Sequence, residues 1–162
     1  MKKILSLRNI FFVLMFGATV MLLLVYLEKS PIMYLNEPFP LPAEKTFVPN
    51  ETIRFIVERC ATKIVPFTVG QSYVADDPNA EVQEFYLESI TTSPTVLGCT
   101  KVLGLPTKIL PEMPTGSYRK KHVISVRGKY KDFVLILYSR SFKVINPHPI
   151  PYEPRTVLPL NK

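Results

Sequence analysis

The chain of 162 residues contains two cysteines, Cys60 and Cys99, and two histidines, His122 and His148. These four side chains lack the close spacing of a zinc site. The sequence also has no G-x-S-x-G or H-E-x-x-H motif and no glycine-rich phosphate loop. We therefore expect a protein that is not an enzyme, with no catalytic residue, no metal and no cofactor. His122 stands in a strand-like run and is interpreted as a structural histidine.

Basic side chains are the one chemical feature above background. Residues 101–131 carry eight basic residues and one acid, a net charge of +7, whereas residues 31–100 carry −5. Alternation along a strand places three of these cations on one face. We predict a basic binding face made of Arg119, Lys121, Arg127, Lys129 and Lys131. Its candidate partners are anionic lipid, a wall polymer or an acidic protein surface, and the alternative is a solvated sheet face.

An apolar block near the N-terminus predicts on which side of a membrane this basic face lies. Ile10–Leu27 contains 18 residues and no charge, and as a helix it spans about 27 Å, close to a hydrocarbon core. Lys2, Lys3 and Arg8 supply +3 of the net charge of +7 ahead of it. The positive-inside rule then assigns residues 1–9 to the cytoplasm and the chain after the block to the periplasmic or extracellular side. We predict a single-pass anchor, residues 10–27, in the inner (plasma) membrane.

A cleaved signal peptide shares the basic start and the apolar core. Cleavage requires small residues just before the cut, and residues 26–32 offer no A-x-A-like site. We therefore predict an uncleaved signal-anchor whose partner is the lipid bilayer. Because the following domain is expected on the periplasmic or extracellular side and lacks an array of aromatic residues for base stacking, we expect no nucleic-acid partner.

Ten of the 16 prolines lie in two flanking segments. Five fall between Pro31 and Pro49, a density that excludes a helix and favours an extended, semi-rigid spacer over residues 28–45. Five more follow Val144 and predict an extended tail over residues 146–162. This tail is either a polyproline II ligand for a partner or a segment that packs on its own domain.

The pattern between the flanks is that of β-strands. Apolar Ile53, Phe55 and Val57 alternate with mainly polar neighbours, and turn-forming residues stand at 76–79 and 127–129. The runs with strand character are 52–58, 62–74, 82–90, 95–103, 118–126 and 133–138. We predict a mainly β fold, an antiparallel sandwich over residues 46–145.

Two short motifs resemble the immunoglobulin-like domains of small single-pass bacterial envelope or phage-encoded membrane proteins. Residues 48–53, VPNETI, resemble the turn and strand that open such domains, with Asn50 in place of the usual Gly. Residues 114–118, PTGSY, resemble the approach to the penultimate strand, which implies a structural tyrosine corner at Tyr118. The chain has no Trp, and Lys120 stands where the second cysteine of an antibody-type bridge would be. The resemblance covers residues 46–145 and implies an immunoglobulin-like sandwich.

Both cysteines lie outside in this topology, and an oxidising compartment makes a Cys60–Cys99 disulfide the expected state. Such a bond would enclose 38 residues, which is worth roughly 3–4 kcal/mol in the chain-entropy model. The alternative is two buried or free thiols.

The sequence thus predicts a membrane-anchored, non-catalytic module that binds or assembles an envelope component outside the cytoplasm. The alternative from another class is a phage-encoded membrane effector that acts in lysis or superinfection exclusion. Small size, one anchor and a short outer domain fit both predictions.

Overall fold

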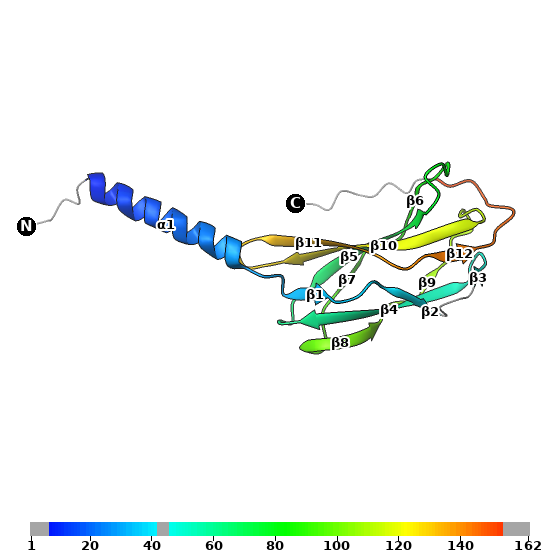
Figure 1. Cartoon of the computed structure of the whole chain (residues 1–162), viewed down its shortest axis with the longest axis horizontal. Coiled ribbons are helices and arrows are strands. Elements are labelled where there is room, and N and C mark those ends of the chain that lie inside the picture. The colour runs from blue at the N-terminus through cyan, green and yellow to red at the C-terminus, as the bar shows by residue number, and fades with distance from the viewer. Residues whose placement is uncertain (1–6, 42–45, 154–162) are drawn as a thin grey trace, which may run out of the picture.

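The computed structural model describes residues 7–41 and 46–153. The helix of this part of the chain, α1 (Leu7–Leu27), projects away from a β domain (Figure 1). Its stretch Ile10–Leu27 is long and apolar enough to cross a membrane, and none of it is buried against the domain. The Thr19 hydroxyl donates to Met15 O at 2.9 Å, which satisfies a polar group within this apolar stretch. The helix ends at Leu27, and Pro31 disfavours its continuation through Ser30.

One sheet is organised around β4 (Thr52–Ala61). Cys60 of β4 pairs with Met33 on one side and with Cys99 on the other, so β1 and β8 flank opposite edges. All four partners of β4 run antiparallel to it: β1 (Ile32–Tyr34), β2 (Phe39–Leu41), β8 (Gly98–Leu103) and β9 (Thr107–Lys108).

The second sheet is organised around the long strand β10 (Gly116–Arg127). β5 (Phe67–Ala75) pairs with it antiparallel from Phe67 to Ala75. The other strands extend the sheet from β5 or from β10: β6 (Glu84–Tyr86) and β7 (Ile90–Thr92) pair with β5, whereas β11 (Asp132–Tyr138) and β12 (Phe142–Val144) pair with β10. β3 (Thr46–Phe47) runs parallel to β12. The predicted mainly β, two-sheet architecture is confirmed, and the immunoglobulin-like strand order stays a prediction.

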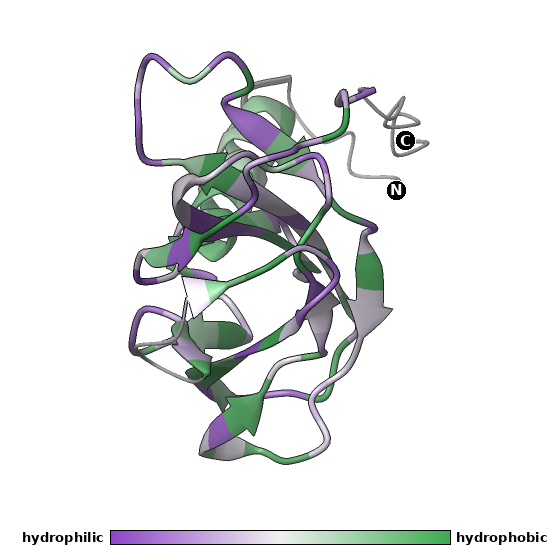
Figure 2. Ribbon diagram, turned by 90° about the vertical axis from the view of Figure 1, so that its right-hand side faces the viewer, coloured by the Kyte–Doolittle hydropathy of each residue, from purple (hydrophilic) through white to green (hydrophobic). Residues whose placement is uncertain are grey.

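The core between the sheets consists of two separate apolar clusters. Hydrophobic and hydrophilic residues alternate along the strands, as expected where one face of each strand points into a core (Figure 2). The smaller cluster lies near α1 and contains Ile32, Phe67, Ile124 and Val126. The larger lies toward the far end of the domain and contains Phe47, Ile53, Phe55, Tyr73, Ala75, Phe85, Ile109, Met113, Tyr118, Phe142 and Val144.

The segment predicted as a spacer is part of the β domain, so that prediction is corrected. β1 and β2 both lie within residues 28–45 and both pair with β4. Proline density excludes a helix but not an edge strand, and Pro40 stands in such a strand. The domain therefore begins at Ile32 rather than at residue 46, and residues 28–31 alone separate it from α1. Residues 42–45 lie outside the described part.

The described part of the predicted tail packs on the domain. Asn146 Nδ2 donates to Pro111 O and to Met113 O at 2.8 and 2.9 Å. The ring of Tyr152 lies 4.9 Å from that of Phe85, centroid to centroid. The domain boundary predicted at residue 145 is therefore too early. The rest of the tail, residues 154–162, lies outside the described residues.

Most predicted strand positions agree with the structure, with shifted ends. The run predicted over 62–74 begins only at Phe67, because Pro66 cannot donate to the strand pairing. The run predicted over 82–90 contains two short strands, β6 and β7. The opening turn behaves as its sequence implies: Asn50 has a φ of 66°, a left-handed conformation that asparagine tolerates.

Candidate functional site

The five residues predicted as one basic face are divided into two groups along β10. Arg119 and Arg127 are separated by about 27 Å at the rise of an extended strand. Arg119 Nε lies 2.6 Å from Asp76 Oδ1, and Lys121 Nζ lies 3.0 Å from Glu84 Oε1. Arg119 and Lys121 are thus neutralised by neighbouring acids, and they do not form a binding face with the other three.

The remaining three, Arg127, Lys129 and Lys131, gather at the turn between β10 and β11, close to the end of α1. We call residues 127–131 the basic hairpin. The Glu28 carboxylate accepts the backbone N–H groups of Lys129, Tyr130 and Lys131 at 2.5, 2.9 and 3.0 Å. Desolvation, which raises the pKa of Glu28, is outweighed by these three donors, so its pKa falls below the ordinary value. The side chain of Glu28, the first residue after α1, is therefore hydrogen-bonded to the backbone of the turn.

Gly128 is the residue that permits this contact. Its N–H donates to Lys131 O at 2.9 Å, which closes the turn. A Cβ at position 128 would overlap Lys131 O and would approach the Phe133 ring and Glu28 Oε1 at 2.7 and 2.9 Å. No side chain fits there without movement of the turn or of Glu28.

The predicted structural residues lie apart from the basic hairpin. Cys60 and Cys99 stand directly opposite each other on β4 and β8 and form a disulfide within one sheet. The Tyr118 hydroxyl donates to Pro114 O at 2.8 Å, a bond back to the backbone of the kind that a tyrosine corner makes. Both features stabilise the domain and neither offers a free reactive group.

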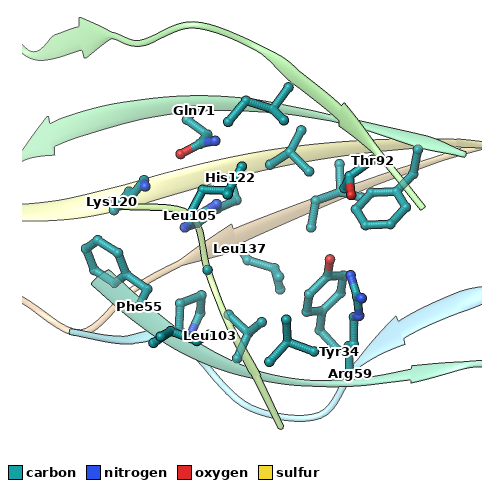
Figure 3. Close-up of a pocket in the computed structure, with 18 of the residues that line it drawn as sticks. Tyr34, Phe55, Arg59, Gln71, Thr92, Leu103, Leu105, Lys120, His122 and Leu137 are labelled. Atoms are coloured by element: carbon teal, nitrogen blue, oxygen red, sulfur yellow. The ribbon is translucent and has the colours of Figure 1, made fainter. Parts of the chain in front are cut away.

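A pocket of about 300 Å³ lies between the two sheets, where the two core clusters do not meet. Apolar side chains from six strands and from the loop after β8 form most of its wall, among them Val69, Leu103, Leu105 and Leu137. Figure 3 shows Lys120 and Arg59 toward opposite ends of this pocket, with His122 and Leu105 between them. No aspartate or glutamate is among the lining residues. The pocket is therefore apolar and bears only cationic or neutral polar groups.

Lys120 is the most deeply buried of these groups, with 1% of its surface exposed. Its ammonium donates to Thr107 Oγ1 and lies 4.9 Å from the centroid of the Phe55 ring. Burial lowers the pKa of Lys120 to about 7. The side chain thus titrates near neutral pH and has a hydroxyl and a ring as partners, with no acid in the pocket to balance its charge.

His122 stands next to Lys120 on the same inward face of β10. Its Nε2 is buried and has no hydrogen-bond partner among the described residues. Burial, with a further contribution from the positive charge of Lys120, lowers the pKa of His122 to about 3. His122 is consequently a neutral imidazole at physiological pH, with one ring nitrogen whose hydrogen-bonding capacity is unused.

Arg59 is the third cationic group. It extends inward from β4, and its guanidinium lies 5.5 Å from the centroid of the Phe67 ring. Burial raises the pKa of the nearby Tyr34 hydroxyl, and Arg59 opposes that rise. Gln71 on β5, directly opposite His122 on β10, adds an uncharged amide to the pocket.

Sequence reasoning missed this pocket although its signal was present. Lys120 and His122 share the even-numbered face of β10 with Tyr118, Ile124 and Val126, which are buried core residues. The strand period alone therefore places both polar side chains inward. The predicted basic face instead used the odd-numbered residues of β10, which point to the opposite side.

Comparisons with known proteins give no family for this chain. No family model matches it, and no curated protein matches it. Among solved structures, the C-terminal domain of Wzt is similar over 75% of this chain and 78% of its own, with 10% identity and a TM-score of 0.49. A putative late embryogenesis abundant protein covers 86% of each chain with 11% identity and a TM-score of 0.45. The Pseudomonas fluorescens alkylpurine DNA glycosylase AlkC, bound to abasic-site DNA, covers 72% of this chain and 31% of its own at 12% identity and a TM-score of 0.41. None of these similarities assigns a function.

Proposed function

We propose that the chain is a membrane-anchored, non-catalytic module that binds or assembles an envelope component on the outer side of the inner (plasma) membrane. The observation that carries this proposal is the junction between α1 and the β domain. An unburied apolar helix ends at Leu27, and Glu28, the next residue, accepts three backbone N–H groups of the basic hairpin. Such a junction holds a folded domain directly against a bilayer.

The proposed orientation has the N-terminus in the cytoplasm. Lys2, Lys3 and Arg8 precede the apolar stretch, and the positive-inside rule favours basic flanks on the cytoplasmic side. The Cys60–Cys99 disulfide supports the same orientation, because disulfides persist in the periplasm and outside cells.

The partner side of this proposal is the basic hairpin rather than the whole face predicted from the sequence. Arg127, Lys129 and Lys131 lie at the end of the domain from which α1 leaves, so the anchored domain presents them to the head groups. Basic residues near an anionic surface each contribute about 1 kcal/mol to binding. Anionic lipid is therefore the proposed partner of this surface, in preference to a wall polymer or an acidic protein.

The test separates anchoring from head-group contact. Protease added to spheroplasts should digest the β domain of the full-length protein, and a protected domain would overturn the proposed orientation. For lipid contact, the triple variant Arg127→Glu, Lys129→Glu, Lys131→Glu is compared with Lys101→Glu, Lys108→Glu, Lys143→Glu, three exposed lysines elsewhere on the domain. In nanodiscs that contain anionic lipid, only the hairpin variant should lose salt-sensitive protection of the turn amides. Equal behaviour of the two variants would contradict the role of the hairpin.

The alternative prediction is a phage-encoded effector of lysis or superinfection exclusion. Expression of the full chain in a bacterial host distinguishes it from the binding or assembly module. Unchanged growth and unchanged infection favour the binding or assembly module. Rapid lysis or blocked infection favours the effector.

A further inference from the structure

The pocket between the sheets is a built feature of the fold. The pocket of about 300 Å³ opens to solvent where Leu103 and Leu105 are exposed, and apolar walls that stay in contact with water are unfavourable. This volume falls at the lower end of the roughly 300–1,000 Å³ typical of small-molecule sites. Its lining includes Phe55 of the larger core cluster and Phe67 and Ile124 of the smaller one, so it lies between the two clusters.

The charged residues of the pocket indicate that its ligand is an anion. Arg59 and Lys120 are cationic side chains, and no acid lines the pocket with them. A buried charge without a counter-ion is costly, and an anion placed against it removes much of that cost. Lys120 has one hydrogen-bond partner among the described residues, the Thr107 hydroxyl, although an ammonium has three donors.

His122 specifies a hydrogen-bonding head group beside Lys120. Its buried Nε2 lacks a partner in the described part of the chain. A neutral imidazole with an N–H at Nε2 donates to a carboxylate oxygen, while the adjacent ammonium supplies the charge. The two groups extend from β10 two residues apart, so they point to the same side of the sheet.

The apolar walls of the pocket indicate the chemistry of the rest of the ligand. Leu103, Leu105 and Leu137 lie between the Lys120 end and the Arg59 end (Figure 3), and Val69 also lines the pocket. Such surfaces accept an alkyl chain, which gains free energy in proportion to the apolar area that leaves water.

We propose that this pocket binds a fatty carboxylate of medium chain length, with the carboxylate against Lys120 and His122 and the alkyl chain along the apolar wall toward Arg59. The inference goes beyond the proposed function and rests on it only for the nearby bilayer as the source of the ligand. No covalent step is involved. The protein acts here as a carrier or sensor of a single-chain anionic amphiphile.

Protonation of Lys120 couples to this binding. Lys120 has a pKa of about 7 in the free protein, so above this pH it must take up a proton to pair with the carboxylate. His122 beside it stays neutral with its pKa of about 3. Burial raises the pKa values of the Tyr34 and Tyr73 hydroxyls, which also stay neutral. Affinity for the carboxylate should therefore decrease as the pH rises above about 7.

The experiment uses the full-length protein in nanodiscs of zwitterionic lipid and decanoate labelled with ¹³C at the carboxyl carbon. Empty nanodiscs correct for partition into lipid. We expect a saturable one-site change in the carboxyl resonance, weaker binding of decanol, which has the same chain without the charge, and no binding of acetate, which has the charge without the chain. Decanol that binds as tightly as decanoate, or decanoate uptake equal to that of empty discs, overturns the proposal.

Variants then locate the head group. Lys120→Met should weaken decanoate binding by about tenfold or more, the loss expected for one charge-assisted hydrogen bond, and should remove its pH dependence. Lys121→Met, the same change one residue along on the outward face, should bind like the wild type. His122→Leu should weaken binding while the protein keeps its fold, as judged by the amide NMR spectrum. If Arg59→Met abolishes binding and Lys120→Met does not change it, the assigned position of the carboxylate is wrong. Because decanoate binding is measured apart from topology, failure of the ligand proposal and failure of the membrane proposal are distinguishable.

Discussion

The Glu28 carboxylate accepts the backbone N–H of Tyr130 at 2.9 Å, although the two residues are 102 positions apart in the chain. This bond and its two neighbours join the end of the helix to the turn of the β10–β11 hairpin. A flexible linker would let the domain rotate freely relative to the helix. Here the turn is bonded to the first residue after the helix, so the orientation of the domain follows that of α1.

The first prediction concerns this contact. Glu28→Ala should increase hydrogen exchange at the amides of Lys129, Tyr130 and Lys131 while leaving the amides of β10 unchanged, because the carboxylate is their acceptor. Amide-resolved exchange by NMR measures this. Glu37→Ala is the control, since Glu37 is an exposed acid in the loop between β1 and β2. Exchange that is the same in wild type and Glu28→Ala would show that the bonds do not persist in solution.

The contact also depends on pH with a defined sign. The pKa of Glu28 is lowered in the folded protein, so its contribution is fully present above the ordinary pKa of a glutamate and is lost as the pH falls through the folded value. Protection of the three turn amides, corrected for intrinsic exchange, should therefore drop in acid, and the drop should be absent in Glu28→Ala.

The alternation of apolar and polar residues located the main strands. Alternate residues such as Ile53 and Phe55 face the core, and this pattern is visible in the sequence without knowledge of the strand pairing. Proline density was misleading at β2, since Pro40 fits an edge strand as well as a linker. The bond between Glu28 and the hairpin turn depends on how distant segments pack, and nothing local in the sequence encodes it. The pocket also depends on tertiary packing, but the inward positions of Lys120 and His122 were predictable from the alternation along β10.

A second prediction follows from the burial of Lys120. Below about pH 7, where Lys120 is mainly charged, Lys120→Met should stabilise the ligand-free protein, because a side chain of similar volume replaces a buried ammonium that has no acidic partner in the pocket. Urea unfolding measures the change, and Lys121→Met serves as the matched control on the solvent side. Destabilisation by Lys120→Met would mean that the ammonium is better satisfied in solution than its single hydroxyl partner indicates.

The pH dependence of stability provides a third prediction. The pKa of Lys120 falls from 10.5 to about 7 on folding, so between these values the unfolded chain binds a proton that the folded chain does not. Stability should consequently rise as the pH increases from about 7 toward 10.5, before other groups titrate. In Lys120→Met this rise should be smaller. A parallel pH profile in the variant would assign the effect to another group.

The Cys60–Cys99 disulfide gives a fourth prediction. It closes a loop between residues 39 positions apart, so reduction should cost roughly 3–4 kcal/mol in the chain-entropy model. The pairing of β4 with β8 continues on the same register from Ala61↔Gly98 to Ile56↔Leu103, so the reduced domain should keep both sheets. Urea unfolding with and without reductant measures the cost, and the double variant Cys60→Ala, Cys99→Ala should be insensitive to reductant.

The tail supplies the last prediction, which distinguishes a loose segment from an integral one. The Asn146 amide is nearly buried and donates to two backbone carbonyls, Pro111 O and Met113 O. Asn146→Ala leaves Met113 O without its donor and Pro111 O with the Ile150 N–H alone, which should lower the free energy of unfolding by about 1–3 kcal/mol. Asn79→Ala, in an exposed turn, is the control and should have little effect. A tail that merely extends from the domain would tolerate both substitutions equally. Equal stability of the two variants would therefore support a domain that ends at residue 145, as the sequence predicted.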